Sequence, residues 1–189
     1  VSPALTESPA LTLTSRMLPG MGAVTETAPA APAGAAAGAG VSLAFSGDFV
    51  VCADNAKFIM AFVNLGLVPD TGGTYLFVKS LGIQKAMELC VTGRPMKAQE
   101  AKDAGMVYDV VPAEELDDTV MKLAKKFASG PLLSYKNIKK QIYQAGLADY
   151  KKYLDECEIP TQRECAASSD FIEGVKAFME KRKAEFKGE

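Results

Sequence analysis

An isolated aspartate marks the first candidate site. Asp70 lies in the segment 64–74 (NLGLVPDTGGT), where apolar residues precede it and two glycines follow shortly after it. A carboxylate in an apolar pocket can act as a general base, because burial disfavours its charged form. The residues alone favour another interpretation, since Asp-Thr-Gly-Gly-Thr before a helix is a common N-cap arrangement. An N-capping carboxylate accepts backbone N–H bonds and is a poor base.

A stretch of small residues forms the second candidate site. Residues 34–40 (GAAAGAG) run directly into a short apolar helix that we predict over 41–45. Small side chains let a ligand approach the backbone, and a helix N-terminus presents N–H groups with no intrahelical partner. Such a segment can hold an oxyanion. An Ala/Gly-rich linker that ends at a helix has the same pattern, and the residues do not decide between the two.

The composition excludes many other chemistries. None of the 189 residues is histidine, which excludes a Ser-His or Cys-His nucleophile and a His-ligated zinc site. Acid–base work must then fall to carboxylates, Tyr, Lys, Cys or the backbone. A net charge of -2 gives no electrostatic reason to expect nucleic acid or a membrane as a partner, and no apolar run is long enough to span a bilayer. The four cysteines lack the spacing of a metal or disulfide site, so we expect no metal.

The type of secondary structure that we predict around these residues changes along the chain. Residues 1–33 are rich in Ala, Pro and Thr and show no periodicity, which predicts an irregular segment. Strands and helices alternate over 34–112, and only helical periodicity follows over 113–189, which indicates an α/β core with a helical C-terminal region. Strands are predicted over 48–53, 57–62 and 106–111, and helices over 41–45, 74–80, 83–91, 98–104, 114–128, 132–145, 150–167 and 170–183, the last with Asp170 as its N-cap.

Several blocks of sequence together resemble one known superfamily. The longest covers 34–82 (GAAAGAGVSLAFSGDFVVCADNAKFIMAFVNLGLVPDTGGTYLFVKSLG). It is followed by AMEL and TG at 86–89 and 92–93, by AQEA and AGMV at 98–101 and 104–107, and by DFIEGVKAFMEKR at 170–182. In this order the blocks resemble the crotonase superfamily, which contains the enoyl-CoA hydratases and isomerases. The resemblance extends over about residues 34–188.

The resemblance implies a fold and a substrate class. The fold would be α/β and crotonase-like, a spiral core of ββα repeats over 34–112 with a helical C-terminal trimerisation region over 113–189. The substrates would be acyl-CoA thioesters, with CoA as part of the substrate and no separate cofactor. The expected setting is fatty acid metabolism in the cytoplasm, with the chain in a homotrimer or a dimer of trimers.

The resemblance also assigns roles to the small-residue stretch. In this family an oxyanion-hole N–H comes from that stretch, and the matching residue is Ala39, flanked by Gly38 and Gly40. The hydratases of the family add water with two glutamates, whereas the matching positions here hold Ser42 and Phe62, which cannot activate water. The resemblance therefore implies an isomerase rather than a two-glutamate hydratase.

Asp70 matches the position of a single catalytic carboxylate in similar isomerases. One carboxylate suits a proton shuttle that converts 3-enoyl-CoA to 2-enoyl-CoA, which makes Asp70 the base rather than an N-cap. Phe62, Leu67 and Val68 would form the apolar walls of its pocket. Further substrate contacts are implied at Gly72 and Gly73, and CoA contacts at Phe178 and Lys181.

The N-terminal residues depart from the family pattern. Family members carry several strands and a helix before the Gly/Ala stretch, which supply the other oxyanion N–H and much of the CoA-binding surface, and residues 1–33 do not resemble that part. The chain is then either a truncated or misread form of a longer enzyme, or a shortened variant that serves as an acyl-CoA-binding or assembly subunit without turnover. Ring-epoxide CoA isomerisation and enoyl-CoA hydration remain alternative activities. A purely structural protein would explain the helices but not the Asp70 loop.

Overall fold

The computed structural model describes residues 34–188, and its strands form two small sheets in the first half of this range. In the first sheet, β1 (Ala35–Ala37) pairs parallel with β3 (Lys57–Ile59), which pairs antiparallel with β4 (Pro95–Lys97). In the second, β2 (Val51–Ala53) and β5 (Asp109–Val111) run parallel. The irregular segment predicted over residues 1–33 lies outside the described residues.

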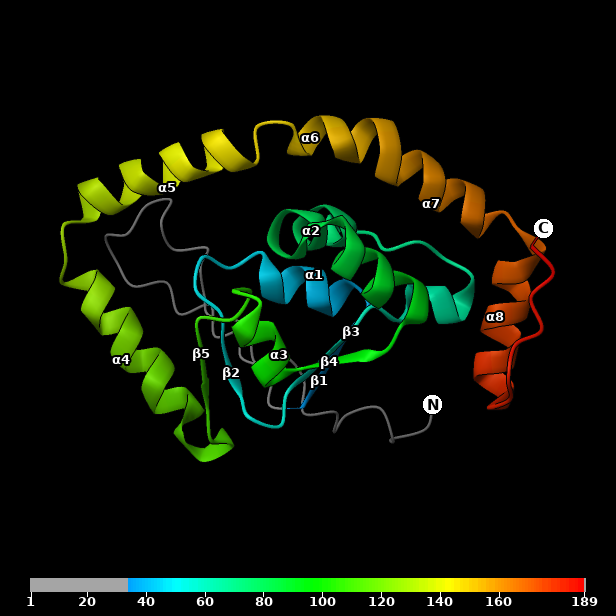
Figure 1. Cartoon of the computed structure of the whole chain (residues 1–189), viewed down its shortest axis with the longest axis horizontal. Helices are drawn as coiled ribbons and strands as arrows, with labels where there is room; N and C mark the ends of the chain where they lie inside the picture. The colour runs from blue at the N-terminus through cyan, green and yellow to red at the C-terminus, as the bar shows by residue number, and fades with distance from the viewer. Residues whose placement is uncertain (1–33, 189) are drawn as a thin grey trace, which may run out of the picture.

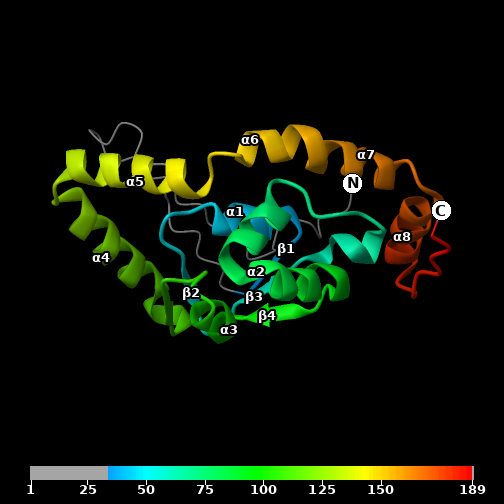
Figure 2. The ribbon, with the colours of Figure 1, turned by 45° about the horizontal axis from the view of Figure 1, so that its top comes forward.

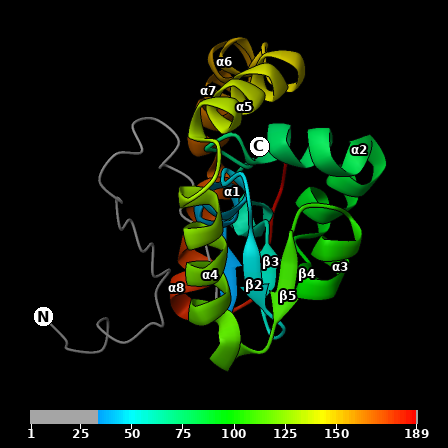
Figure 3. The same ribbon diagram turned by 90° about the vertical axis from the view of Figure 1, so that its left-hand side faces the viewer.

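Helices α1 (Ala39–Phe45) and α2 (Gly73–Thr92) pack with these strands around one apolar core (Figures 1 and 3). The ring of Phe45 lies 4.6 Å from that of Phe58 in β3 and 5.9 Å from that of Phe77 in α2, measured between centroids. The two helices predicted over 74–80 and 83–91 form the single helix α2, which is kinked at Gly82 where φ is 75° and ψ is 168°. Helix α3 (Ala98–Asp103) follows β4 directly.

Two strands are missing from the sequence prediction, and all three predicted strands are shorter than expected: 48–53 is observed as β2, 57–62 as β3 and 106–111 as β5. The strand β1 lies inside the small-residue stretch 34–40, where no strand is predicted because three alanines carry no apolar–polar alternation. The strand β4 is equally short and forms by pairing with β3. The strand predicted over 57–62 ends at Ile59, since η2 (Ala61–Leu65) is a 3₁₀ helix closed by Gly66 with a φ of 68°.

After β5 the described chain contains helices only. Figures 1 and 2 show these helices as an arc around the α/β core, from α4 on one side over α5, α6 and α7 to α8 on the other. The helix predicted over 150–167 is interrupted by a π-helical turn, η4. No helix in the described range is long and apolar enough to cross a membrane. The elements are η3 (Ala113–Glu115), α4 (Leu116–Ala128), α5 (Leu132–Gly146), α6 (Tyr150–Tyr153), η4 (Leu154–Glu158), α7 (Ile159–Ala166) and α8 (Ser169–Glu180).

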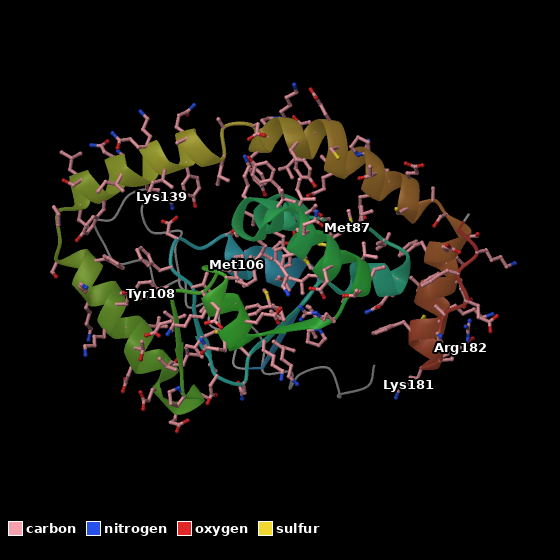
Figure 4. The ribbon with its side chains drawn as sticks, viewed as in Figure 1. Met87, Met106, Tyr108, Lys139, Lys181 and Arg182 are labelled. Carbon is pink, nitrogen blue, oxygen red and sulfur yellow. The ribbon has the colours of Figure 1, made fainter. Side chains whose placement is uncertain are left out.

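Polar contacts attach the arc to the core. On α5, Lys139 (labelled in Figure 4) pairs with Asp48 at 2.8 Å, and the Tyr143 hydroxyl donates to the same carboxylate at 2.9 Å. Burial, followed by the bond to Asp48, raises the pKa of Tyr143 to about 12. At the start of α6, Asp149 accepts a 2.5 Å hydrogen bond from the Tyr75 hydroxyl of α2. These contacts attach α5 and the beginning of α6 to the core.

The last helix, α8, begins earlier than predicted. Its N-cap is Ser168, whose hydroxyl accepts the Phe171 N–H at 3.0 Å, so the predicted N-cap at Asp170 is wrong. Ser168 is the last residue with extended backbone angles, whereas Asp170 already lies in the first helical turn. The helix packs closely on η2, because a Cβ on Gly174 would lie 2.7 Å from the Leu65 carbonyl carbon.

Candidate functional site

Asp70 lies in the loop between η2 and α2, and its backbone is tied to α1. The Ser42 hydroxyl donates to the Asp70 carbonyl oxygen at 3.1 Å, and the Gly73 N–H donates to the same oxygen at 3.0 Å. Ser42 is only 2% exposed, and a Cβ on Gly73 would lie 2.6 Å from its hydroxyl oxygen. The missing side chain of Gly73 therefore allows the loop to approach α1. The structure brings these three predicted site residues together.

Phe62 lies beside the beginning of α1. It is 8% exposed, and its ring carbon Cζ would be 3.7 Å from a Cβ placed on Gly38. Gly38 precedes the helix with a φ of 57°, while Ala39 and Gly40 are the first two helical residues. The N–H groups of a first helical turn have no partner within the helix. The predicted oxyanion donor at Ala39 therefore lies at a helix start that an aromatic ring borders.

Leu67 and Val68 form the apolar part of the loop before Asp70. Both are partly buried, and the Leu67 N–H donates to the Phe62 carbonyl at 3.0 Å. Leu67 also packs against the main core. Three residues predicted as apolar walls therefore lie on one segment, and the backbone bond joins two of them directly.

The residues after Asp70 are held by a glutamate from the C-terminal arc. The Gly72 N–H lies 3.0 Å from each carboxylate oxygen of Glu158 in η4. Thr71 and Gly72 have left-handed φ values of 54° and 78°, and successive N–H groups in such a turn converge on an anion. A left-handed conformation costs a residue with a Cβ, here Thr71, roughly 1–2 kcal/mol. The contact with Glu158 therefore stabilises a turn in which Thr71 is strained.

The structure also decides the N-cap question at this loop. The N-cap of α2 is Gly72, and no side chain caps that helix end. The alternative in which Asp70 is an N-cap is therefore wrong. As an N-cap, the Asp70 side chain would accept the Gly72 N–H. In the structure that N–H donates to Glu158 instead.

Glu158 itself is a buried acid, only 5% exposed. Burial raises its pKa above the usual value, the charge of Asp70 raises it further, and the Gly72 N–H bond lowers it in part. Sequence reasoning missed Glu158 because it lies 86 residues from Gly72, in an acidic helical run that is typical of a solvated face.

The Asp70 carboxylate keeps one oxygen free. Its Oδ2 accepts a 3.4 Å hydrogen bond from Nε2 of Gln162 in α7. Among the described residues, the buried side-chain oxygens without a hydrogen-bond partner are Oδ1 of Asp70 and Oε1 of Gln162. A buried, unpartnered carboxylate oxygen can accept a proton from a bound molecule. Gln162 carried no signal in the sequence, since its contact with Asp70 spans 92 residues.

A group of tyrosines covers the same loop. The Tyr150 ring packs on Tyr75 with 5.0 Å between centroids, and Tyr153 lies 5.3 Å from Tyr75 on the same measure. A Cβ on Gly72 would lie 1.9 Å from the Tyr150 hydroxyl oxygen, so the loop backbone fits directly under that phenol. Burial, followed by the charge of Glu158, raises the pKa of Tyr150.

The residues expected to contact CoA lie elsewhere. Phe178 is 76% exposed on α8, and Lys181 follows the helix with a φ of 54°. Figure 4 shows Lys181 and Arg182 at the end of α8, away from the core. Arg182 pairs with Glu173 at 2.6 Å. The structure does not join these residues to the Asp70 loop, and their contact with CoA stays a prediction. Within the described range no group of three or more acidic, cysteine or histidine side chains is arranged to hold a metal.

Comparison with known proteins gives the same family by several routes. The model of the enoyl-CoA hydratase/isomerase family matches residues 27–189. Trans-2-decenoyl-[acyl-carrier-protein] isomerase of Streptococcus mutans serotype c is 39% identical over 155 residues, which cover 82% of this chain and 59% of the relative. 1,2-epoxyphenylacetyl-CoA isomerase of Escherichia coli (strain K12) is 43% identical over 155 residues with the same coverage.

Solved structures agree with this result. An enoyl-CoA hydratase from Mycobacterium avium subsp. paratuberculosis K-10 superposes with a TM-score of 0.78 and 35% identity, over 82% of this chain and 62% of that one. The chain spans about 59% of the length of the two isomerases that it matches. On the family match and the shared crotonase fold, the chain belongs to the enoyl-CoA hydratase/isomerase family of the crotonase superfamily.

Proposed function

We propose that this protein moves a double bond in an acyl thioester, converting 3-enoyl-CoA to 2-enoyl-CoA. The observation that carries the proposal is the buried Oδ1 of Asp70, which has no hydrogen-bond partner. No second free carboxylate accompanies it among the described site residues. Ser42 and Phe62 occupy the flanking positions, and Glu158 is bound to the Gly72 N–H.

The proposed reaction uses one carboxylate twice. Oδ1 of Asp70 takes a proton from C2 of the substrate, and the electron pair moves onto the thioester oxygen as a dienolate forms. The Ala39 N–H donates to that oxygen, and such a donor in a dry site contributes roughly 3 kcal/mol. Asp70 then returns the proton to C4, which leaves the double bond between C2 and C3. The step needs no cofactor apart from the CoA carried by the substrate.

Hydration would need a second group that positions water, and the residues that the structure describes around Asp70 offer none in a suitable state. Glu158 is 5% exposed, and both of its oxygens lie against the Gly72 N–H. The Ser42 hydroxyl already donates to the Asp70 carbonyl. These contacts support isomerisation over hydration.

A second candidate substrate is a ring-epoxide CoA ester. It is favoured by the 43% identity to 1,2-epoxyphenylacetyl-CoA isomerase, the higher of the two isomerase identities. Side-by-side turnover of a 3-enoyl-CoA and a ring-epoxide CoA ester separates the two activities.

We also propose that the chain assembles as a homotrimer or a dimer of trimers. Apolar side chains of α8 support assembly, because Ile172, Phe178 and Met179 are 68%, 76% and 77% exposed. Light scattering of the purified chain measures the oligomer directly.

The experiment compares isomerisation and hydration on one sample. Asp70→Asn should lower 3-enoyl-CoA isomerisation by about 100-fold or more, because the amide cannot carry the proton. Asp103→Asn is a matched control, since Asp103 is an exposed aspartate on α3 that also accepts a glutamine hydrogen bond. Strong hydration that survives Asp70→Asn would contradict the proposal. Tight CoA-ester binding without any turnover would instead favour an acyl-CoA-binding subunit.

A further inference from the structure

Gln162 contacts the proposed base from a remote part of the chain. Its Nε2 lies 3.4 Å from Oδ2 of Asp70, whereas its own Oε1 is buried without a hydrogen-bond partner. The distance exceeds the usual N–H···O value of about 2.9 Å, and catalytic hydrogen bonds are often long before substrate is bound. Gln162 therefore directs a donor at Oδ2 of Asp70 and leaves Oδ1 free.

A proton shuttle presents its neighbours with two different partners in turn. The ionised carboxylate only accepts hydrogen bonds, whereas the protonated acid also donates one. When the proton is on Oδ1, that oxygen donates toward the substrate, and Oδ2 still accepts a hydrogen bond from a neighbouring donor. The NH₂ group of Gln162 can therefore donate to Oδ2 in either form of Asp70, while an ionised Glu158 could only accept.

The backbone that carries Gln162 is fixed against the loop that carries Asp70. Glu158 and Gln162 are four residues apart on the helical path through η4 and α7, so they face the same side. The Gly72 N–H binds Glu158 at 3.0 Å. Gln162 therefore lies one helical turn from the contact that holds the turn after Asp70.

We propose that Gln162 is a positioning residue for Asp70, donating through Nε2 to Oδ2 both when Asp70 is ionised and when Oδ1 carries the proton. The same oxygen of Asp70 then stays directed at the substrate in both halves of the reaction. This inference rests on the proposed isomerisation.

The test replaces the amide without changing the length of the side chain. Gln162→Met removes both donor and acceptor, and should lower kcat by about 10-fold or more with little change in KM, because Gln162 contacts Asp70 rather than the substrate. The acid limb of the kcat/KM profile should move to higher pH, because the ionised form has lost a donor. Gln162→Glu should move that limb further, since it adds a second negative charge to that of Glu158, the titratable neighbour whose charge acts on this site.

The matched control is Gln99→Met. Gln99 donates to Asp103 at 2.7 Å on the exposed face of α3, so this variant also loses a glutamine–aspartate bond. It should keep the wild-type pH profile. If Gln162→Met misfolds by circular dichroism, Gln162→Leu, which also lacks the donor and the acceptor, carries the same test. Folded Gln162 variants with the wild-type acid limb would overturn the inference.

A turnover-independent measurement separates this inference from the proposed function. The infrared carboxylate band of Asp70 is identified by its loss in Asp70→Asn, and its titration should move to higher pH in Gln162→Met. A wild-type protein without isomerase turnover would refute the proposed function, while the infrared titration would still decide whether Gln162 supports the ionised form. An unchanged infrared titration would refute the role of Gln162 even in an active isomerase.

Discussion

Gly72→Ala should destabilise the protein through two separable effects. The first is backbone strain, because Gly72 has a φ of 78°, where a residue with a Cβ pays roughly 1–2 kcal/mol. The second is a clash, because the new Cβ would lie 1.9 Å from the Tyr150 hydroxyl oxygen and 2.7 Å from Cζ of that ring. Moving a packed ring aside costs roughly 1–3 kcal/mol. We expect the free energy of unfolding to fall by about 2–5 kcal/mol.

Gly105→Ala isolates the backbone effect. Gly105 has nearly the same φ, 77°, but a Cβ there would meet nothing within 4 Å. This control should therefore lose only the roughly 1–2 kcal/mol of strain. The difference between the two variants measures the contact between the loop and Tyr150.

Urea unfolding followed by far-ultraviolet circular dichroism gives both free energies by linear extrapolation. Tyr150→Ala in the Gly72→Ala background should recover roughly 1–3 kcal/mol of coupling in a double-mutant cycle, because the ring that clashes is gone. Equal losses in Gly72→Ala and Gly105→Ala would show that the loop is not packed under Tyr150. Coupling close to zero in the cycle would show the same independently.

Two further substitutions test the oxyanion donor and the buried acid. Ala39→Pro removes the N–H at the first helical position, where proline is well tolerated, so kcat should fall by roughly 100- to 1,000-fold with little change in urea stability; an unchanged kcat would exclude Ala39 as donor. Glu158→Gln tests linkage: because burial raises the pKa of Glu158 above its usual 4.5, the folded protein retains a proton that the unfolded chain releases. Wild-type stability should therefore decline as pH rises from 4.5 through the raised value, and urea midpoints of Glu158→Gln should decline less over that range; parallel pH curves would exclude the buried acid as the cause.

The sequence predicts best the helices whose apolar periodicity is visible along the chain. The apolar stripe of Leu116, Val120, Leu123 and Phe127, with spacings of four, three and four, predicts the helix observed as α4 (Leu116–Ala128). The kink of α2 at Gly82 lies between the two separate helices predicted over 74–80 and 83–91. The short strands β1 and β4 were missed because their formation depends on pairing with β3 rather than on any periodicity of their own.

The candidate site also contains both residues that the sequence predicts and residues that it does not. The loop of Asp70, the start of α1 and the apolar residue Phe62 were all predicted from their sequence neighbourhood and the family resemblance, and the structure joins them. Glu158 and Gln162 were not predicted, because a buried acid and a surface acid have the same sequence context in an amphipathic helix. Only the packing of the arc over the loop distinguishes them.

The contacts between the helical arc and the Asp70 loop have a consequence for the order of folding. The contacts of Gly72 with Glu158 and of Asp70 with Gln162 join positions 86 and 92 residues apart. Such distant pairings carry a large loop-closure entropy and form late, after local helices and neighbouring strands. A nascent chain that has already completed its sheets therefore still lacks the contacts that Glu158 and Gln162 make with the Asp70 loop, and these form only when the final third of the polypeptide docks.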